Sequence, residues 1–183
     1  MDIFAHGLWA GAAAKAATRK GLRISAWRAA LWGVFPDFFA FAPLFVWLII
    51  QLLFTGEVSS LIARPDAAEP PPHDGMLFQI TQGLYSISHS FFVFILVCGV
   101  LFLLYRLKIF RRIPWEIGGW FLHILIDIPT HSYEFYPTPF LWPLSDWKFD
   151  GFSWGHPWFI FINYVTLFAV YLPFLMGRSR SHS

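Results

Sequence analysis

Five ionisable side chains lie within or against strongly apolar stretches of this sequence: His6, Asp37, His89, His123 and Asp127. An ionisable group in a membrane-like environment is costly and normally faces a partner, a cavity or an ion. Histidine nitrogens and aspartate oxygens are also the ligand atoms that zinc and similar metals take in proteins. We therefore expect these five residues to form a buried metal site that is assembled from several helices.

The composition indicates the environment of that site. The chain has 183 residues, of which 57% are hydrophobic, 21% are aromatic and only 13% are charged. Because about a quarter of the residues in a soluble domain are charged, this composition is typical of an integral membrane protein. The length suits a single membrane-embedded helical domain that covers residues 1–183.

The apolar segments predict an all-α, polytopic membrane bundle of about four to five apolar helices. We expect helices at about 3–19, 25–54, 86–107, 115–129 and 157–176. The second segment contains Pro36, so it is expected to be either one long helix broken near that residue or two helices. The stretch at 86–107 is long enough to cross the hydrocarbon core of a bilayer.

Basic residues give the bundle an expected orientation. They gather after the first helix, after the segment that ends near 107, and in the tail 177–183, whereas acidic residues outnumber basic ones in the loops 55–75 and 129–156. Cytoplasmic loops carry an excess of Lys and Arg. The pattern therefore predicts a multi-pass protein of the inner (cytoplasmic) membrane, with cytoplasmic basic flanks and tail and with both acidic loops outside.

The same map places the five polar residues at a similar depth. At about 1.5 Å of rise per residue, they lie roughly 17 to 26 Å from the nearest basic anchor on their own segments. Four segments thus bring them to one layer in the outer half of the bilayer. A shared site explains this convergence better than chance does.

His123 and Asp127 are four residues apart, so a helix places both on the same face, as two ligands of one metal require. The alternative is a His–Asp hydrogen bond, or an aspartate that only caps the helix before Pro129. His131 follows that proline and could supply a further ligand or a proton-transfer group, although a loop histidine is more often neither; we expect the proton-transfer role. His89 would, taken alone, be interpreted as an interfacial histidine, and His6 as part of a solvated amphipathic terminus.

Four short motifs resemble a known family. An early helical His followed by small residues (His6-Gly7), a Pro-Asp after an apolar helix (Pro36-Asp37), a His-Ser that opens a span (His89-Ser90) and a His-x-x-x-Asp (His123 to Asp127) occur in this order. The order is similar to that of the bacterial membrane-bound metal-dependent hydrolases and, remotely, of zinc-dependent phospholipase C. The resemblance implies that Asp37, His89, His123 and Asp127 hold one metal, with Asp127 bridging to a second metal near His6.

The chain differs from the family pattern at two places. Phe39 stands where the family often has a second acid, and Leu84-Tyr85 stands where it often has His-Arg.

These observations predict a metal-dependent membrane hydrolase, with zinc as the expected divalent metal. A site within the lipid layer favours a membrane lipid or a lipid-linked phosphoester as substrate, and nothing in the sequence indicates a nucleic-acid partner. Two alternatives remain open. The cluster could hold the helices in register without catalysis, or it could belong to a metal or proton transporter.

Overall fold

The computed structural model describes residues 1–54, 75–134 and 136–176. Every regular element in those ranges is helical, as the sequence predicts. The elements are α1 (Ile3–Arg19), α2 (Ala26–Phe54), α4 (Met76–Ser88), α5 (Phe91–Arg106), a short 3₁₀ turn at Trp115–Ile117, α6 (Gly118–Thr130) and α7 (Pro157–Met176). The predicted loop 55–75 and tail 177–183 fall almost entirely outside the described residues.

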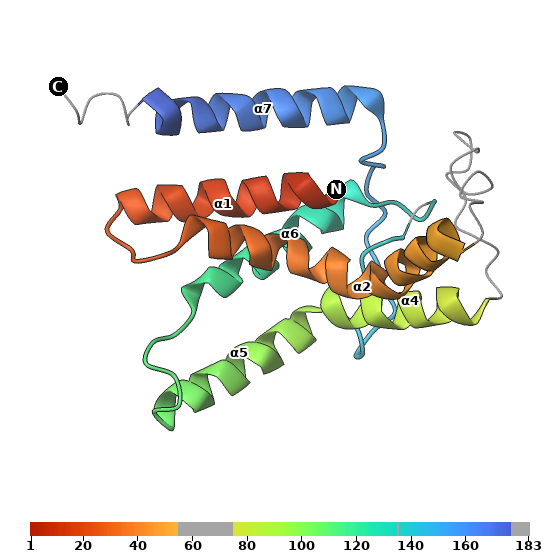
Figure 1. Cartoon of the computed structure of the whole chain (residues 1–183), viewed down its shortest axis with the longest axis horizontal. Coiled ribbons are helices and arrows are strands. Elements are labelled where there is room, and N and C mark those ends of the chain that lie inside the picture. Colours follow the sequence, from red (N-terminus) through yellow and green to blue (C-terminus); the bar gives the residue numbers. More distant parts are fainter. Residues whose placement is uncertain (55–74, 135, 177–183) are drawn as a thin grey trace.

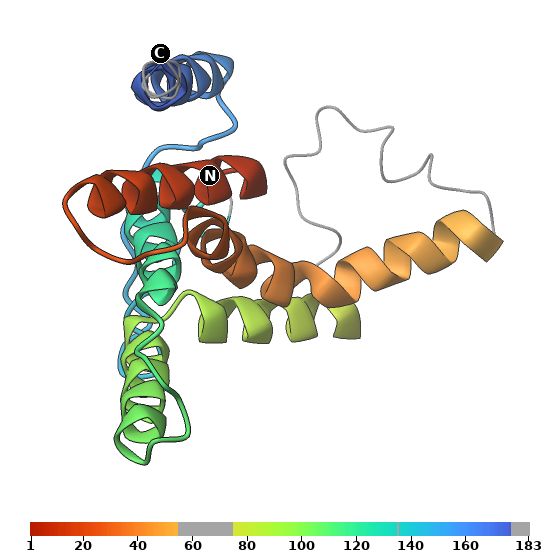
Figure 2. The same ribbon diagram turned by 60° about the vertical axis from the view of Figure 1, so that its left-hand side comes forward.

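The helices form successive layers, seen in Figures 1 and 2. Helix α1 lies between α7 on one side and α2 with α6 on the other, and α4 runs along the face of α2 that is turned away from α1. The C-terminal ends of α1, α5 and α7 and the start of α2 lie on the same side of the molecule in Figure 1. The helix ends that carry the basic residues are therefore grouped together.

Two helices, α2 and α7, are long and apolar enough to cross a membrane. Helices α4 and α5 give a third candidate span if the pair, bent by 60° at its break, is counted as one. With 17 and 13 residues, α1 and α6 are shorter than the roughly 20 residues that a span needs. The fold is thus consistent with a membrane protein with two to three spanning elements, fewer than the four to five apolar helices that the sequence predicts.

Two predicted elements differ from the structure. The helix expected at 86–107 begins only at Phe91, because α4 ends at Ser88 and the Ser90 side chain caps α5 by accepting hydrogen bonds from Phe92 and Val93. Helix α2 continues through Pro36 and does not break there. Membrane helices tolerate proline where neighbouring groups satisfy the freed backbone.

Two glycines allow the close helix crossings that build the site. A Cβ on Gly33 of α2 would lie 2.8 Å from the carbonyl oxygen of His6 in α1. A Cβ on Gly119 of α6 would collide with the carbonyl oxygen of Ala29 in α2. Three helix backbones therefore meet within one turn of the positions that carry His6, Asp37 and His123.

In its described residues, 131–134 and 136–156, the connection between α6 and α7 has no helix, as predicted, and its backbone is hydrogen-bonded to the helix ends. Gly151 N–H donates to the carbonyl of His131, and Trp154 N–H donates to that of Thr130. Phe91 N–H, in the first turn of α5, donates to the carbonyl of Phe140. This connection packs against the end of α6 that carries the polar cluster.

Candidate metal centre

The five sequence-predicted residues are brought together from three helices and one helix break. His6 comes from α1, Asp37 from α2, and His123 and Asp127 from α6, while His89 occupies the break between α4 and α5. Their side chains are buried, and none of the residues is more than 6% exposed. We call these five residues the His/Asp cluster.

Four members of the cluster could hold one metal ion. One ligand atom from each of Asp37, His89, His123 and Asp127 lies within 4.8 Å of the corresponding atoms of the other three. Two imidazole nitrogens and two carboxylate oxygens make a donor set of the kind that zinc accepts. The structure thus supports a site for a metal ion at these four residues, without specifying which metal.

Backbone carbonyls orient both imidazoles of this group. His123 Nδ1 lies 2.7 Å from the carbonyl oxygen of Gly33, and His89 Nδ1 lies 3.0 Å from that of Tyr85. Because a carbonyl oxygen only accepts hydrogen bonds, we assign the ring proton to Nδ1 in both residues. His89 Nδ1 also lies 2.9 Å from the Ser88 hydroxyl, which accepts from the same proton in this assignment. A backbone carbonyl on the far ring nitrogen is the usual orienting contact of a histidine that binds metal.

This assignment leaves the lone pairs of His89 and His123 directed at each other. The two Nε2 atoms are only 3.0 Å apart. Two neutral imidazoles that both carry a proton on Nδ1 cannot form a hydrogen bond between their Nε2 atoms, so the contact is repulsive unless a cation or an added proton lies there. A metal ion bound by both nitrogens would remove that repulsion.

The carboxylate of Asp127 completes the arrangement through Oδ2, which lies 3.0 Å from Nε2 of His123 and 3.4 Å from Nε2 of His89. Although these atoms are close, Oδ2 is buried without a well-oriented hydrogen bond. Asp37 approaches from the other side, with Oδ1 3.5 Å from Nε2 of His89. Close contacts without hydrogen-bond geometry are expected of atoms that converge on a common ion.

The second oxygen of Asp127, Oδ1, faces a different set of groups. It lies 2.9 Å from Nε2 of His6, 3.4 Å from Nδ1 of His131 and 2.7 Å from the amino group of Met1. The His6 ring stacks on that of His123, with ring centroids 3.7 Å apart. Asp127 therefore joins the four-residue group to His6 and His131, as expected of a bridging carboxylate.

His131, the predicted proton-transfer residue, lies at the edge of the cluster. It is 5% exposed and follows the last turn of α6. Burial lowers the pKa of His131 to about 4, so the imidazole is neutral near pH 7. This neutral imidazole is in the protonation state of a base, and its low pKa makes it a weak one.

Sequence reasoning missed several neighbours of the cluster. The Tyr85 ring stacks on that of His89 at a centroid distance of 3.8 Å, in a position where the resembled family often has a basic residue. Its spacing of four residues before His89 is a signal that could have indicated this contact. The carbonyl of Gly33 and the amino group of Met1 have no sequence signal, since backbone groups reach the site only through the helix crossings.

The balance of charges in the cluster is compatible with a bound cation. Among the residues that the structure describes, neither Asp37 nor Asp127 pairs with a Lys or Arg side chain, and the amino group of Met1 is the basic group that contacts Asp127 besides the imidazoles. Two buried carboxylates and two lone pairs that face each other need more positive charge than one ammonium group supplies. The residues present fit a divalent ion on this observation.

Comparison with protein-family models, curated proteins and solved structures gave no match for this chain. The resemblance to the membrane-bound metal-dependent hydrolases therefore stays a prediction that depends on the four short motifs.

Proposed function

We propose that this protein is a metal-dependent hydrolase of the membrane that acts on a lipid or lipid-linked phosphoester, with zinc as the metal. The single observation that carries the proposal is the Nε2–Nε2 contact of 3.0 Å between His89 and His123, beside two buried carboxylates. No arrangement of ring protons on the two neutral imidazoles satisfies both their backbone carbonyls and each other. A divalent ion satisfies all four groups at once.

Each residue of the cluster has a part in this proposal. Asp37, His89, His123 and Asp127 would hold the catalytic ion, and His6 would hold a second ion that Asp127 bridges. A bound divalent ion supplies Lewis acidity: it makes a bound water easier to deprotonate and polarises a phosphoryl or acyl oxygen.

The protein's own groups would orient the ligands, exclude water and transfer the proton. The carbonyls of Gly33 and Tyr85 keep both imidazole rings fixed, and the burial of the cluster limits the access of water. His131 would accept the proton of the attacking water and return it to the leaving group.

The proposed topology places the cluster within the membrane, and this position favours a lipid as substrate. In the proposed topology α1 and α6 are shorter apolar helices beside the spans, which gives a bundle of four to five apolar helices with the cluster in the outer half of the bilayer. The basic helix ends would face the cytoplasm in the inner membrane. Single-cysteine labelling from the two sides of intact cells, in a chain whose Cys98 is replaced, tests this: reagents that do not cross the membrane should label the 129–156 connection from outside.

A second candidate is favoured by a specific contact. The Met1 ammonium lies 2.7 Å from Asp127 Oδ1 and neutralises part of its charge without any metal. A protonated His89 or His123 would then turn the cluster into a hydrogen-bonded network that only fixes the helices in register. On this alternative the protein is a non-catalytic membrane scaffold.

Metal analysis and turnover separate the two candidates. The detergent-purified protein is compared with Asp127→Ala, and Asp146→Asn is the matched control because Asp146 is an exposed aspartate of the 129–156 connection. We expect bound zinc in the parent and in the control but not in Asp127→Ala.

Hydrolysis of a panel of lipid phosphoesters, with added zinc or manganese, should follow metal content. His131→Ala should keep its metal and lose about 10²- to 10⁴-fold in turnover. A parent that binds no metal would support the scaffold and overturn the hydrolase. A parent that binds metal without hydrolysing any member of the panel would point to a metal-stabilised scaffold.

A further inference from the structure

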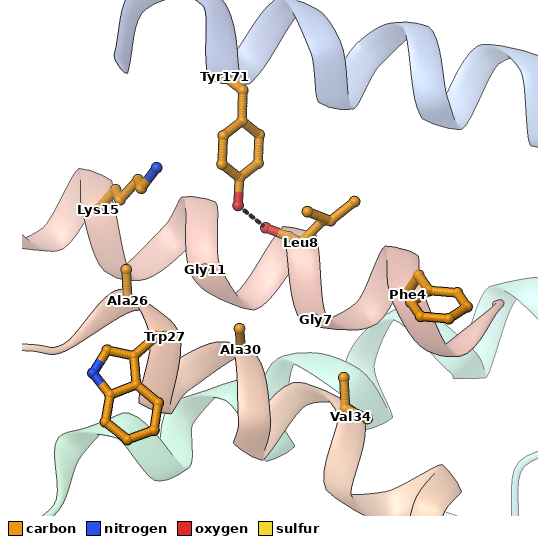
Figure 3. A pocket seen from close by; sticks show the side chains of 10 residues that line it. All are labelled: Phe4, Gly7, Leu8, Gly11, Lys15, Ala26, Trp27, Ala30, Val34 and Tyr171. Atoms are coloured by element: carbon orange, nitrogen blue, oxygen red, sulfur yellow. Dashed lines mark hydrogen bonds between the residues drawn. The ribbon is translucent and has the colours of Figure 1, made fainter. Parts of the chain in front are cut away.

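An open apolar groove runs along the seam between α1 and α2 and is separate in its lining from the His/Asp cluster. Figure 3 shows it from close by, with Lys15 near one end, Phe4 near the other and Tyr171 of α7 above. Its volume is about 610 Å³, within the range of roughly 300 to 1,000 Å³ that is typical of small-molecule sites. We propose that this groove binds one acyl chain of an anionic phospholipid whose phosphate is held by Lys15.

Small residues create the groove. Gly7 and Gly11 of α1 face Ala26, Ala30 and Val34 of α2, so no large side chain of these two helices fills the seam. A Cβ on Gly11 would lie 3.0 Å from the hydroxyl of Tyr171, which donates a hydrogen bond to the carbonyl of Leu8. The floor of the groove is therefore built mainly from backbone, methyl groups and apolar side chains, with Lys15 and the Tyr171 hydroxyl as the polar groups of its lining.

The groove is open to the surroundings of the bundle. Phe4 is 78% exposed and Trp27 is 63% exposed, and both belong to its lining. Because α2 is apolar and long enough to cross a membrane, a membrane around the bundle would present lipid rather than water to this seam. The hydrocarbon part of a lipid is the occupant whose chemistry matches this lining.

The length of the groove matches one leaflet. From Phe4 to Lys15 the helix rises about 16 Å, which is close to half of the ~30 Å hydrocarbon core of a bilayer. A chain that enters beside Lys15 would thus run about 16 Å along α1 and end near Phe4. This match favours a single acyl chain that comes from the leaflet at the basic end of the bundle.

Charge at one end specifies the headgroup. The Lys15 ammonium lies 4.7 Å from the centre of the Tyr171 ring and 5.5 Å from that of Phe174. Within the described part of the chain no carboxylate is in ion-pair distance of Lys15. A cation that aromatic rings hold in place at the membrane surface, without an acidic partner, is complementary to a lipid phosphate.

This lipid is not the proposed substrate. A phosphate at Lys15 would lie about 13 Å along α1 from the level of His6, toward the opposite end of the helix from the cluster. The proposed occupant is a resident lipid that completes the packing of α1, α2 and α7. The inference is independent of whether the cluster binds metal.

The test measures lipid that stays on the full-length protein. Protein reconstituted with equal amounts of phosphatidylglycerol and phosphatidylcholine, with identical acyl chains, is extracted in detergent, and retained lipid is quantified by native mass spectrometry. We expect phosphatidylglycerol to be retained in preference. Lys15→Gln should lower its retention about fivefold, as expected for the loss of one basic residue near a charged surface, and Lys20→Gln, just beyond the end of α1, should not.

A second pair of variants tests the groove itself. Ala30→Leu places a larger side chain in the groove and should reduce the retention of both lipids, whereas Ala13→Leu, on an exposed face of α1 outside the lining, should leave it unchanged. Helical content and gel-filtration volume show that each variant is folded, and Ala26→Leu replaces Ala30→Leu if that variant fails. Equal retention of the two lipids by the parent, equal losses in Lys15→Gln and Lys20→Gln, or full retention in a folded Ala30→Leu or Ala26→Leu would each overturn the proposal.

Discussion

The α6 segment carries a buried acid at each end, and the two acids are held in opposite ways. Glu116, in the turn before α6, is 2% exposed, and Asp127, near the end of α6, is 0% exposed. Glu116 Oε1 accepts a hydrogen bond of 2.7 Å from Arg112 and another from the backbone N–H of Ser25. Asp127 is surrounded by imidazoles and by one amino group.

The electrostatics of the two ends differ accordingly. Burial alone would raise the pKa of Glu116, but the hydrogen bonds from Arg112 and from the backbone outweigh it and the pKa is lowered. Arg112 is permanently charged, so this acid is neutralised in every state of the protein. The imidazoles around Asp127 are charged only when protonated. The comparison teaches that the first acid belongs to an ion pair with a permanently charged arginine, whereas the second belongs to a group of residues that could hold a metal ion.

The largest expected difference between variants at the two ends of α6 is in their affinity for zinc. Asp127→Asn keeps the shape of the side chain but removes the charge that would offset a bound ion, so we expect zinc affinity to fall by about 100-fold or more, beyond the 10- to 100-fold typical of losing an outer-shell partner. Glu116→Gln should leave affinity unchanged. Competition with a chromophoric zinc chelator measures both. Equal affinities for parent and Asp127→Asn would contradict the assignment of Asp127 as a ligand.

The polar residues of the cluster are the part of this molecule that the sequence could predict. His123 and Asp127 are visible because they interrupt an apolar run, and their spacing of four already places them on one face. The bounds of α1 and α7 follow from apolar length in the same way. A polar residue within an otherwise apolar stretch is therefore a strong indication of a buried site.

Glu116 does not lie within an apolar stretch, and the sequence analysis did not single it out. It lies in a mixed segment just after Arg111 and Arg112, where an acid is expected to be solvated. Its burial depends on the close crossing of α6 and α2 at Gly119, which is a tertiary feature. For the same reason the break at His89 could not be placed, since it depends on packing between helices rather than on local propensity.

A second prediction concerns stability with and without metal. A ligand that binds only the folded state at 100 times its dissociation constant stabilises the protein by about 2.7 kcal/mol. Zinc at that concentration should therefore raise the thermal midpoint of the parent and of Glu116→Gln, and a chelator should reverse the rise. Asp127→Asn should show no zinc-dependent change. If zinc does not change the thermal midpoint of the parent, the folded protein does not bind zinc at Asp127. The proposed difference between Asp127 and Glu116 would then be wrong.

A third prediction uses adjacent glycines at the Glu116 end. Gly119→Ala puts a methyl group against the Ala29 carbonyl, and overpacking of this kind typically costs about 1–3 kcal/mol. Gly118→Ala is the matched control, because a Cβ there would meet nothing within 4 Å. Denaturant unfolding in detergent should show the loss only for Gly119→Ala. If the two variants are equally stable, α6 and α2 are not in the close contact that positions His123.

The smallest expected effect is that of Glu116→Gln on stability, and its pH dependence identifies the cause. A hydrogen bond to a charged group contributes about 1.5–3 kcal/mol, and because Arg112 is half exposed to solvent we expect a loss of about 1–2 kcal/mol. The pKa of Glu116 in the folded protein lies below its ordinary value of 4.5, so the folded state favours the ionised form. The stabilisation is therefore fully present above pH 4.5 and is lost as the pH falls through the folded pKa. Unfolding measured from pH 7 down to pH 4 should show a constant gap between parent and variant that narrows only at the acid end. A gap that is the same at pH 4 as at pH 7 would mean that the variant acts through packing, and the ion pair would no longer distinguish this end of α6 from the other.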